Sequence, residues 1–207
     1  MHSQLVLHGA PTGNCFRAAI ALSEAGLPYA VQRVQLRQGE HKQAEYLAVN
    51  PLGQVPALAI PERDGPGSFL TQSNAIMFYA AEAAPAAGLL GKEPSQRARV
   101  LERFFYFLTE VITPSYTSFQ LKNAFAPGAA QILDNKFLAR LAYAEQFLLG
   151  QPYMAGDSFT LADIAAFTVA YAYREVLEWP VLPRLRAWYS HLAQRPGIQH
   201  GMNIFAS

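Results

Sequence analysis

The chain has 207 residues, of which 51% are hydrophobic and 15% are charged. This apolar content suffices for a buried core and excludes intrinsic disorder, and the length leaves room for one large domain or two small ones. Sixteen basic residues against fifteen acidic ones give a formal net charge of +1, so no basic field favours nucleic acid or an anionic membrane surface. The single cysteine, Cys15, can form neither an internal disulfide nor a cysteine-rich metal site. We expect a small-molecule or protein partner and no metal.

The start of the chain shows no export signal, because the apolar run at residues 5–7 is short and no basic segment precedes it. A longer apolar stretch, residues 159–173, contains Asp163 and falls short of the about 20 apolar residues that a membrane span needs. The lone cysteine fits a reducing compartment. The sequence therefore predicts a cytoplasmic protein that does not enter the membrane.

Short β-type runs alternate with helical patterns over the first 84 residues. Two of these runs flank a helix, and Gly26 and Pro28 mark the end of that helix. The two runs and the helix together predict a βαβ unit. Farther on, the turn-rich residues 61–67 separate two short apolar runs, as in an antiparallel hairpin with a long loop. The expected order is β-α-β-α-β-β-α, with elements at residues 4–7, 16–25, 29–34, 40–48, 57–60, 68–71 and 73–83.

Strand signals vanish after a linker at residues 84–95, which is rich in Ala, Gly and Pro. Apolar side chains instead recur at three- and four-residue spacing, which is typical of amphipathic helices. The expected helices cover residues 97–113, 131–149, 161–174 and 182–194. The sequence thus predicts an α/β domain at residues 1–84 and an all-helical domain at residues 94–207.

Residues 50–58 lead from a helix into a strand and place Pro56 at the start of that strand, where no ladder hydrogen bond is needed. If the Val55-Pro56 bond is cis, the turn presents the main-chain groups of Val55 to an extended peptide. Only a minority of X-Pro bonds are cis, so a turn that merely shapes the fold is the alternative.

A second motif is the segment at residues 71–76, where a strand runs into a helix. Ser73 and the first amides of that helix favour an anion, because unpaired N–H groups and the helix dipole both attract negative charge. Gln72 adds an amide that can hold a carboxylate or an ammonium group. The alternative is that Thr71 or Ser73 only caps the helix.

The loop at residues 10–17 gathers Thr12, Asn14 and Cys15 at the start of the first helix. Amide and side-chain donors converge there, and strand-to-helix junctions are common places for sites in α/β units. Each of the three motifs alone has a structural explanation. In the predicted layout all three can face one pocket, and their conjunction favours a binding site.

Four motifs follow one another in order along nearly the whole chain. They are Gly39-Glu40-His41-Lys42, residues 50–58, Gln72-Ser73-Asn74-Ala75-Ile76 and Phe159-Thr160-Leu161-Ala162-Asp163-Ile164. With this order and spacing the chain resembles a cytosolic glutathione transferase. The resemblance implies a thioredoxin-like N-terminal domain, an all-α C-terminal domain and a homodimer. It also implies that glutathione binds to the first domain and a small hydrophobic electrophile between the domains.

The resemblance further implies roles for single residues toward glutathione, namely for His41, Gln54, Val55, Pro56, Gln72 and Ser73. Val55, before the proline, would pair with the cysteinyl backbone. Gln72 and Ser73 would hold the γ-glutamyl end, and His41 with Gln54 would reach the glycyl end. The family often has Glu where this chain has Gln72, so we expect different electrostatics around the glutamyl ammonium group.

The group that activates the thiol divides the classes of this family. Residues 5–16 contain neither Tyr nor Ser, so the tyrosine-type and serine-type classes are disfavoured. Asn14 occupies the position of the reactive cysteine in the cysteine-type class. Cys15 follows one residue later, where other classes also carry a Cys whose side chain lies in the helix. Thr12-Gly13-Asn14 resembles the Thr-Pro-Asn arrangement of the bacterial nu class and its fungal prion-related relatives.

Thr12, Asn14 and Cys15 are therefore the catalytic candidates, and a packing role is the alternative for Cys15. Hydrogen bonds from Thr12 and Asn14 would stabilise the glutathione thiolate for conjugation to small electrophiles. Two alternatives remain: glutathione-dependent reduction of disulfides or peroxides, and a non-catalytic binding protein of this fold. Candidates for the electrophile pocket are Phe104, Phe105, Leu108, Tyr116 and Phe119, and candidates for contacts with glutathione across a dimer interface are Arg17, Arg97, Arg99 and Arg103.

Overall fold

The computed structural model describes residues 4–62 and 67–206, and residues 63–66 of the predicted hairpin loop lie outside the described part. The chain divides into two compact units. One consists of Gly88–Ala193, and the other of the residues up to Ala87 together with the C-terminal segment from Gln194. The boundaries expected from the sequence, 1–84 and 94–207, differ from this division at the C-terminal end, because the last residues group with the α/β unit.

Four strands form the sheet of the first unit, in the order β2-β1-β3-β4. They are β1 (Leu5–Gly9), β2 (Tyr29–Arg33), β3 (Ala57–Ile60) and β4 (Ser68–Thr71). β1 and β2 are parallel, whereas β3 is antiparallel to both β1 and β4. The predicted βαβ unit and the antiparallel hairpin are confirmed.

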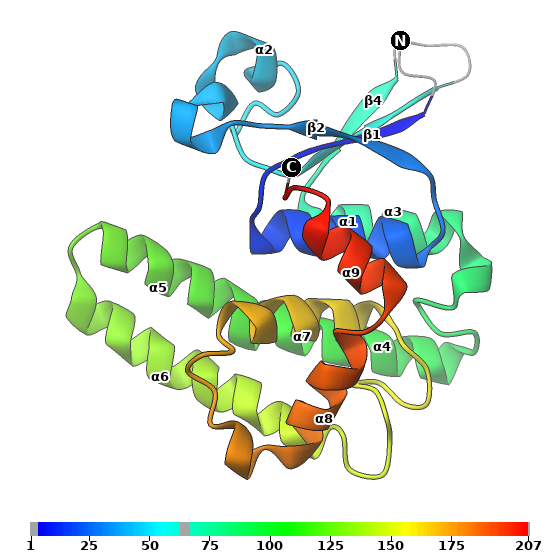
Figure 1. The fold of residues 1–207 in the computed structure, drawn as a ribbon, viewed down its shortest axis with the longest axis vertical. Helices are drawn as coiled ribbons and strands as arrows, with labels where there is room; N and C mark the ends of the chain where they lie inside the picture. The colour runs from blue at the N-terminus through cyan, green and yellow to red at the C-terminus, as the bar shows by residue number, and fades with distance from the viewer. Residues whose placement is uncertain (1–3, 63–66, 207) are drawn as a thin grey trace. The chain divides into compact units, whose positions relative to one another are not determined.

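Two helices lie side by side against one face of this sheet, α1 (Gly13–Glu24) and α3 (Ser73–Ala83), as Figure 1 shows. α1 begins at Gly13 rather than at residue 16, because the Thr12 side chain caps it by accepting a hydrogen bond from the Cys15 N–H. The short helix α2 (Ala44–Leu47) follows two 3-10 turns between β2 and β3. The early start of α1 brings the predicted catalytic residues into its first turn.

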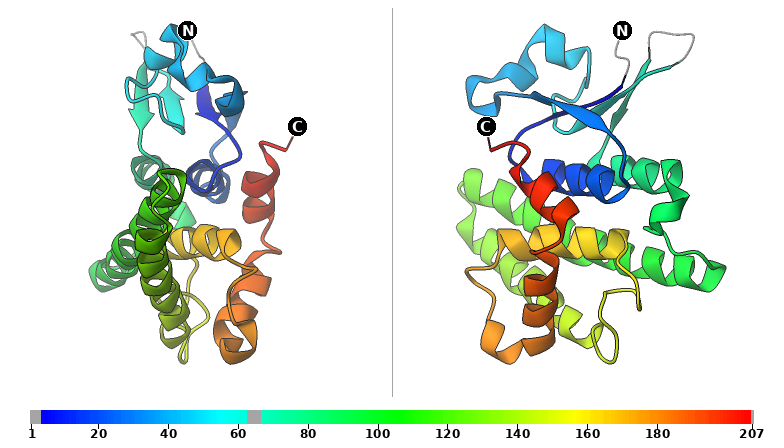
Figure 2. Two further views of the ribbon diagram at one scale, coloured as in Figure 1. Left: turned by 90° about the vertical axis from the view of Figure 1, so that its left-hand side faces the viewer. Right: turned by 45° about the vertical axis from the view of Figure 1, so that its right-hand side comes forward.

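The second unit is built from helices, as predicted. They are α4 (Pro94–Tyr106), α5 (Thr113–Asn123), α6 (Pro127–Tyr143), α7 (Leu161–Ala172) and α8 (Pro183–Leu192). α5 and α6 form a helical hairpin, which is visible in Figures 1 and 2. α7 is the core helix, because every residue from Leu161 to Ala170 is buried. Across residues 4–62 and 67–206, no helix has both the length and the apolar character needed to cross a bilayer.

The helix expected at residues 97–113 is part of a longer helical stretch. α4 continues through a π-helical segment, Phe107–Ile112, directly into α5. Pro114 has no N–H to donate to the carbonyl four residues earlier. The preceding Thr113 N–H donates five residues back, to the Leu108 carbonyl. The proline therefore shifts the register of the helix rather than ending it.

α7 begins with the capping box predicted at Thr160 and Asp163. The Asp163 carboxylate is fully buried and accepts hydrogen bonds from the Thr160 N–H and hydroxyl, the Met154 N–H and the Trp188 indole N–H. Burial raises the pKa of Asp163 to about 6, although these donors act to lower it. The carboxylate thus joins α7 to the preceding loop and to α8, which is a folding role.

Helix α9 (Pro196–Asn203) lies beyond the last helix that the sequence predicted, and it packs along α1 (Figure 2). Gly201 approaches α1 so closely that a Cβ would lie 2.6 Å from the Ile20 nitrogen. At the start of α9, Arg195 forms an ion pair with Glu24, with 2.6 Å between Nη2 and Oε2. These contacts attach the C-terminal segment to the first unit.

Replacing Gly201 with alanine is expected to lower the free energy of unfolding by about 1–3 kcal/mol, because the new methyl group would push α9 away from α1. Gly128→Ala on α6 is the matched control, since a Cβ there meets no atom within 4 Å. The helix propensity of alanine predicts no loss for this control, or a gain of up to about 1 kcal/mol. Urea unfolding followed by circular dichroism measures both variants, and equal stability would contradict the close packing of α9.

Candidate active site

The predicted site segments meet at one end of the sheet. His8, near the end of β1, pairs with Ala57 at the start of β3, and Ala57 pairs with Thr71 at the end of β4. The β1–α1 loop, the turn before β3 and the start of α3 therefore lie close together. Antiparallel pairing of β3 with both neighbours produces this arrangement, because it sets the start of β3 beside the ends of β1 and β4.

The β1–α1 loop ends in a cluster of hydrogen-bond donors. Thr12 is the N-cap of α1, and its hydroxyl oxygen accepts the Cys15 N–H at 3.3 Å, which leaves the hydroxyl proton to donate elsewhere. The N–H groups of Gly13 and Asn14 lie in the first turn, where no acceptor exists within the helix. The Thr12 side chain is half-buried and Asn14 is exposed. Together with the helix dipole, these donors can hold an anion such as a thiolate.

Cys15 has no exposed surface. Its Sγ accepts a hydrogen bond from the Ala10 N–H at 3.4 Å. Burial raises the pKa of the Cys15 thiol, although Thr12, Ala10 and Arg17 act to lower it. Since the thiolate is the nucleophile, this environment favours the packing role for Cys15 and leaves any reacting sulfur to come from a ligand.

The Val55-Pro56 peptide bond is cis, which confirms the conformation considered from the sequence. The main chain before it is held in place by two donors to the Gln54 carbonyl: the Tyr46 hydroxyl at 2.8 Å and the Asn50 side-chain amide at 2.7 Å. Both ladders of β3 begin at Ala57, so the Val55 main chain lies outside them. Sequence reasoning missed Tyr46, because nothing in its local pattern links it to a carbonyl eight residues later.

Gln72 and Ser73 open α3. Gln72 is exposed and has a φ of 74°, in a region that residues other than glycine rarely adopt. Its carbonyl accepts the Ile76 N–H at 3.1 Å, so this conformation is tied to the first turn of the helix. Backbone strain that the surrounding structure maintains is frequent at ligand-binding positions. Ser73 is nearly buried beside it, with 5% of its surface exposed.

His41 lies in the 3-10 turn Glu40–Lys42, which contacts the segment before Val55. The Lys42 ammonium group donates to the Gly53 carbonyl at 3.4 Å, and a Cβ on Gly53 would lie 2.6 Å from the His41 carbonyl oxygen. Gln54 is exposed next to this contact. The Nδ1 atom of His41 is buried and has no hydrogen-bond partner among the described residues. The contacts of this turn with Gly53 thus place His41 beside Gln54.

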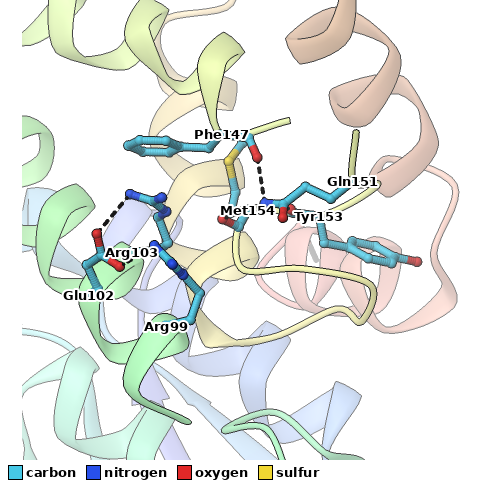
Figure 3. Close-up of polar contacts among 7 residues, drawn as sticks. All are labelled: Arg99, Glu102, Arg103, Phe147, Gln151, Tyr153 and Met154. Atoms are coloured by element: carbon cyan, nitrogen blue, oxygen red, sulfur yellow. Dashed lines mark hydrogen bonds and ion pairs between the residues drawn. The ribbon is translucent and has the colours of Figure 1, made fainter. Parts of the chain in front are cut away.

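Two of the arginine candidates, Arg99 and Arg103, lie on α4 and share Glu102, as Figure 3 shows. Arg99 Nη1 donates to Glu102 Oε2 at 2.7 Å, and Arg103 Nη1 donates to Oε1 at 3.2 Å. The Arg103 guanidinium also lies over the Phe147 ring, 3.8 Å from its centroid. These contacts hold both cations within the second unit, and we assign neither of them to the glutathione site.

The aromatic candidates for an electrophile pocket differ in exposure. Phe104 is buried in the core of the second unit, in an edge-to-face contact with Phe105, so it has a packing role. Phe105, Tyr116 and Phe119 are exposed and remain available to a ligand. Over the described part of the chain, no group of three or more His, Cys, Asp or Glu side chains is placed to hold a metal ion.

Two family models match the chain, the glutathione S-transferase N-terminal domain at residues 3–82 and the C-terminal domain at residues 111–196. Glutathione S-transferase 3 of Zea mays is 34% identical and covers 94% of this chain and 91% of its own length. Glutathione S-transferase GstA of Escherichia coli O157:H7 is 31% identical and covers 92% of this chain and 94% of its own. A crystal structure of a glutathione transferase homolog from Sulfitobacter with bound glutathione is 26% identical, with a TM-score of 0.78 and 96% of each chain covered. The chain belongs to the glutathione S-transferase family.

Proposed function

We propose that this protein is a glutathione transferase that joins the sulfur of glutathione to small hydrophobic electrophiles. The observation that carries the proposal is the meeting of the β1–α1 loop, the Val55-Pro56 turn and the start of α3 at one end of the sheet. Membership of the family supports the same function. The Val55 main chain pairs with the cysteinyl residue of glutathione, and Gln72 with Ser73 holds the γ-glutamyl end.

The glycyl end of glutathione is assigned to His41 and Gln54. The contact of the Glu40–Lys42 turn with Gly53 supports this role, because it places His41 beside Gln54. An imidazole N–H of His41 suits the glycyl carboxylate, and the exposed Gln54 amide supplies a second donor beside it.

Thr12 and Asn14 activate the thiol by stabilising its anion. A cysteine thiol has an ordinary pKa of about 8.5, so most of it is protonated at neutral pH. The Thr12 hydroxyl, the Asn14 side-chain amide and the first N–H groups of α1 donate to the sulfur and favour the thiolate, and the proton passes to solvent. No general base is needed, and the protein adds proximity by holding the thiolate against the electrophile.

Two alternatives to conjugation are a reductase that uses the same bound thiolate and a binding protein without catalytic activity. A disulfide or peroxide in place of the electrophile makes the protein a glutathione-dependent reductase, and the burial of Cys15 means that glutathione rather than the protein would supply the sulfur. A non-catalytic binding protein would keep the fold without turnover. The resemblance to the family also supports a cytoplasmic homodimer.

Titration calorimetry with reduced glutathione and with S-methylglutathione tests binding. Turnover of 1-chloro-2,4-dinitrobenzene then measures conjugation, and turnover of 2-hydroxyethyl disulfide measures reduction. We expect both peptides to bind and the aromatic electrophile to be conjugated. A wild-type protein that does not bind glutathione overturns the proposal, whereas turnover of the disulfide alone favours the reductase.

A further inference from the structure

Phe205, beyond the end of α9, fills the space behind the β1–α1 loop. Its side chain is buried, with 2% of the residue exposed. A Cβ on Gly9 would lie 2.8 Å from Phe205 Cζ and 3.2 Å from Cys15 Sγ. On the other side, the Phe16 ring centroid lies 6.2 Å from that of Phe205. The ring thus contacts residues on both sides of the loop that carries Thr12.

The C-terminal segment reaches this position by running along α1 from one end to the other. Arg195 pairs with Glu24 in the last turn of α1, with 3.1 Å between Nε and Oε1 and 2.6 Å between Nη2 and Oε2. Gly201 lies against Ile20 in the middle, and Phe205 lies against Phe16 in the first turn. These three contacts fix the direction of the C-terminal segment along α1 and thereby hold Phe205 in place.

We infer that Phe205 is a positioning residue for thiol activation, which holds residues 10–14 so that Thr12 and Asn14 face the sulfur of bound glutathione. The inference rests on the proposed function. Gly9 has no side chain and Cys15 has a small one. The Phe205 ring therefore fills most of the space between the end of β1 and the first turn of α1. Without it, the loop can move into that space, and hydrogen bonds to a thiolate lose strength when their geometry is relaxed.

The effect of Phe205 on the ionisation of the glutathione thiol can be measured through the pH dependence of conjugation. The titratable groups near this loop have pKa values outside the neutral range. Burial raises the pKa of the Cys15 thiol and of the Tyr46 hydroxyl and lowers that of Arg17 to about 10. None of these groups changes charge between about pH 6 and pH 8. Among the described residues of the C-terminal segment, Arg195 and His200 lie farther along α1, since Arg195 pairs with Glu24 and the His200 ring contacts the ring of Tyr29.

Phe205→Leu tests the inference, with Phe125→Leu as the matched control because Phe125 is 94% exposed. The pH profile of kcat/KM for conjugation is measured for both variants and for the wild type. We expect Phe205→Leu to lose about threefold at about pH 6.5 and much less at about pH 8, because a thiol with poorer donors needs a higher pH to ionise. The control is expected to follow the wild type at every pH.

Gly9→Ala disturbs the same contact from the other side, since its backbone lies outside the left-handed region and the atoms nearest to the new methyl group belong to the Phe205 ring and to Cys15. We expect the same pH-dependent loss, and a double variant that loses no more than either single one. A loss of the same size at every pH, no loss, or a Phe205→Leu protein that does not fold would overturn the inference. If the wild type binds glutathione and turns over, such a result leaves the proposed function intact.

Discussion

Asn14→Ala is expected to reduce kcat/KM for glutathione conjugation by about 10- to 100-fold, because it removes a hydrogen bond to a charged sulfur worth about 1.5–3 kcal/mol. Thr12→Val keeps the shape of the side chain and removes the hydroxyl, so we expect a loss of similar size. This second variant also deprives the Cys15 N–H of its acceptor, which costs about 1 kcal/mol of stability. Steady-state rates over a range of pH, with 1-chloro-2,4-dinitrobenzene as substrate, measure both effects.

Cys15→Ala is the matched control for these two variants. The Cys15 side chain has no exposed surface, so its removal is expected to lower the thermal midpoint while leaving kcat/KM close to that of the wild type. This comparison distinguishes between two hypotheses, that the reacting sulfur belongs to glutathione or that it belongs to Cys15. If Cys15→Ala is inactive although folded, and Asn14→Ala retains activity, the protein's own thiol is the nucleophile and the proposed role of Asn14 is wrong.

The difference between Asn14 and Cys15 shows where sequence reasoning loses precision. Successive residues of an α-helix point about 100° apart, so a step of one residue decides between an exposed amide and a buried thiol. The sequence placed the start of this helix at residue 16, which left both residues in a loop of unknown direction. The Thr12 cap sets the start at Gly13 and thereby fixes which of the two is exposed and which is buried.

Local patterns predicted the hairpin and α3 well, because the turn-rich residues 61–67 separate two short apolar runs and a helical pattern follows them. β3, β4 and α3 have the predicted bounds. α9 was missed for the opposite reason: two glycines within eight residues make it a weak helix former. Its conformation depends on packing against α1, a contact that no local pattern reports.

The site was predicted as three motifs that can face one pocket, and the register of the sheet places the three segments at one end of it. The cis Val55-Pro56 bond was one of two conformations left open. Its support by Tyr46 and Asn50 depends on side-chain contacts with a single carbonyl. Such contacts follow from the folded geometry of the turn and are not encoded in residue spacing.

Gln72→Ala is expected to raise the KM for glutathione by about 10- to 100-fold with little change in kcat, since a hydrogen bond to the charged glutamyl end contributes equally before and during the reaction. Gln72→Gly is the control that separates the loss of the side chain from the strain of the main chain at this position. The φ of 74° at this position strains alanine as much as glutamine, whereas glycine adopts it freely. We therefore expect the glycine variant to be more stable than the alanine variant by about 1 kcal/mol, as urea unfolding would measure.

Both variants are expected to show the same rise in KM, because both lack the side-chain amide. Equal KM values combined with unequal stabilities would separate two roles of this residue: its side chain binds glutathione, and its strained main chain sets the direction of the first turn of α3. A glycine variant that keeps the wild-type KM would contradict the assignment of the Gln72 side chain to glutathione, because the amide would then contribute nothing that the backbone does not.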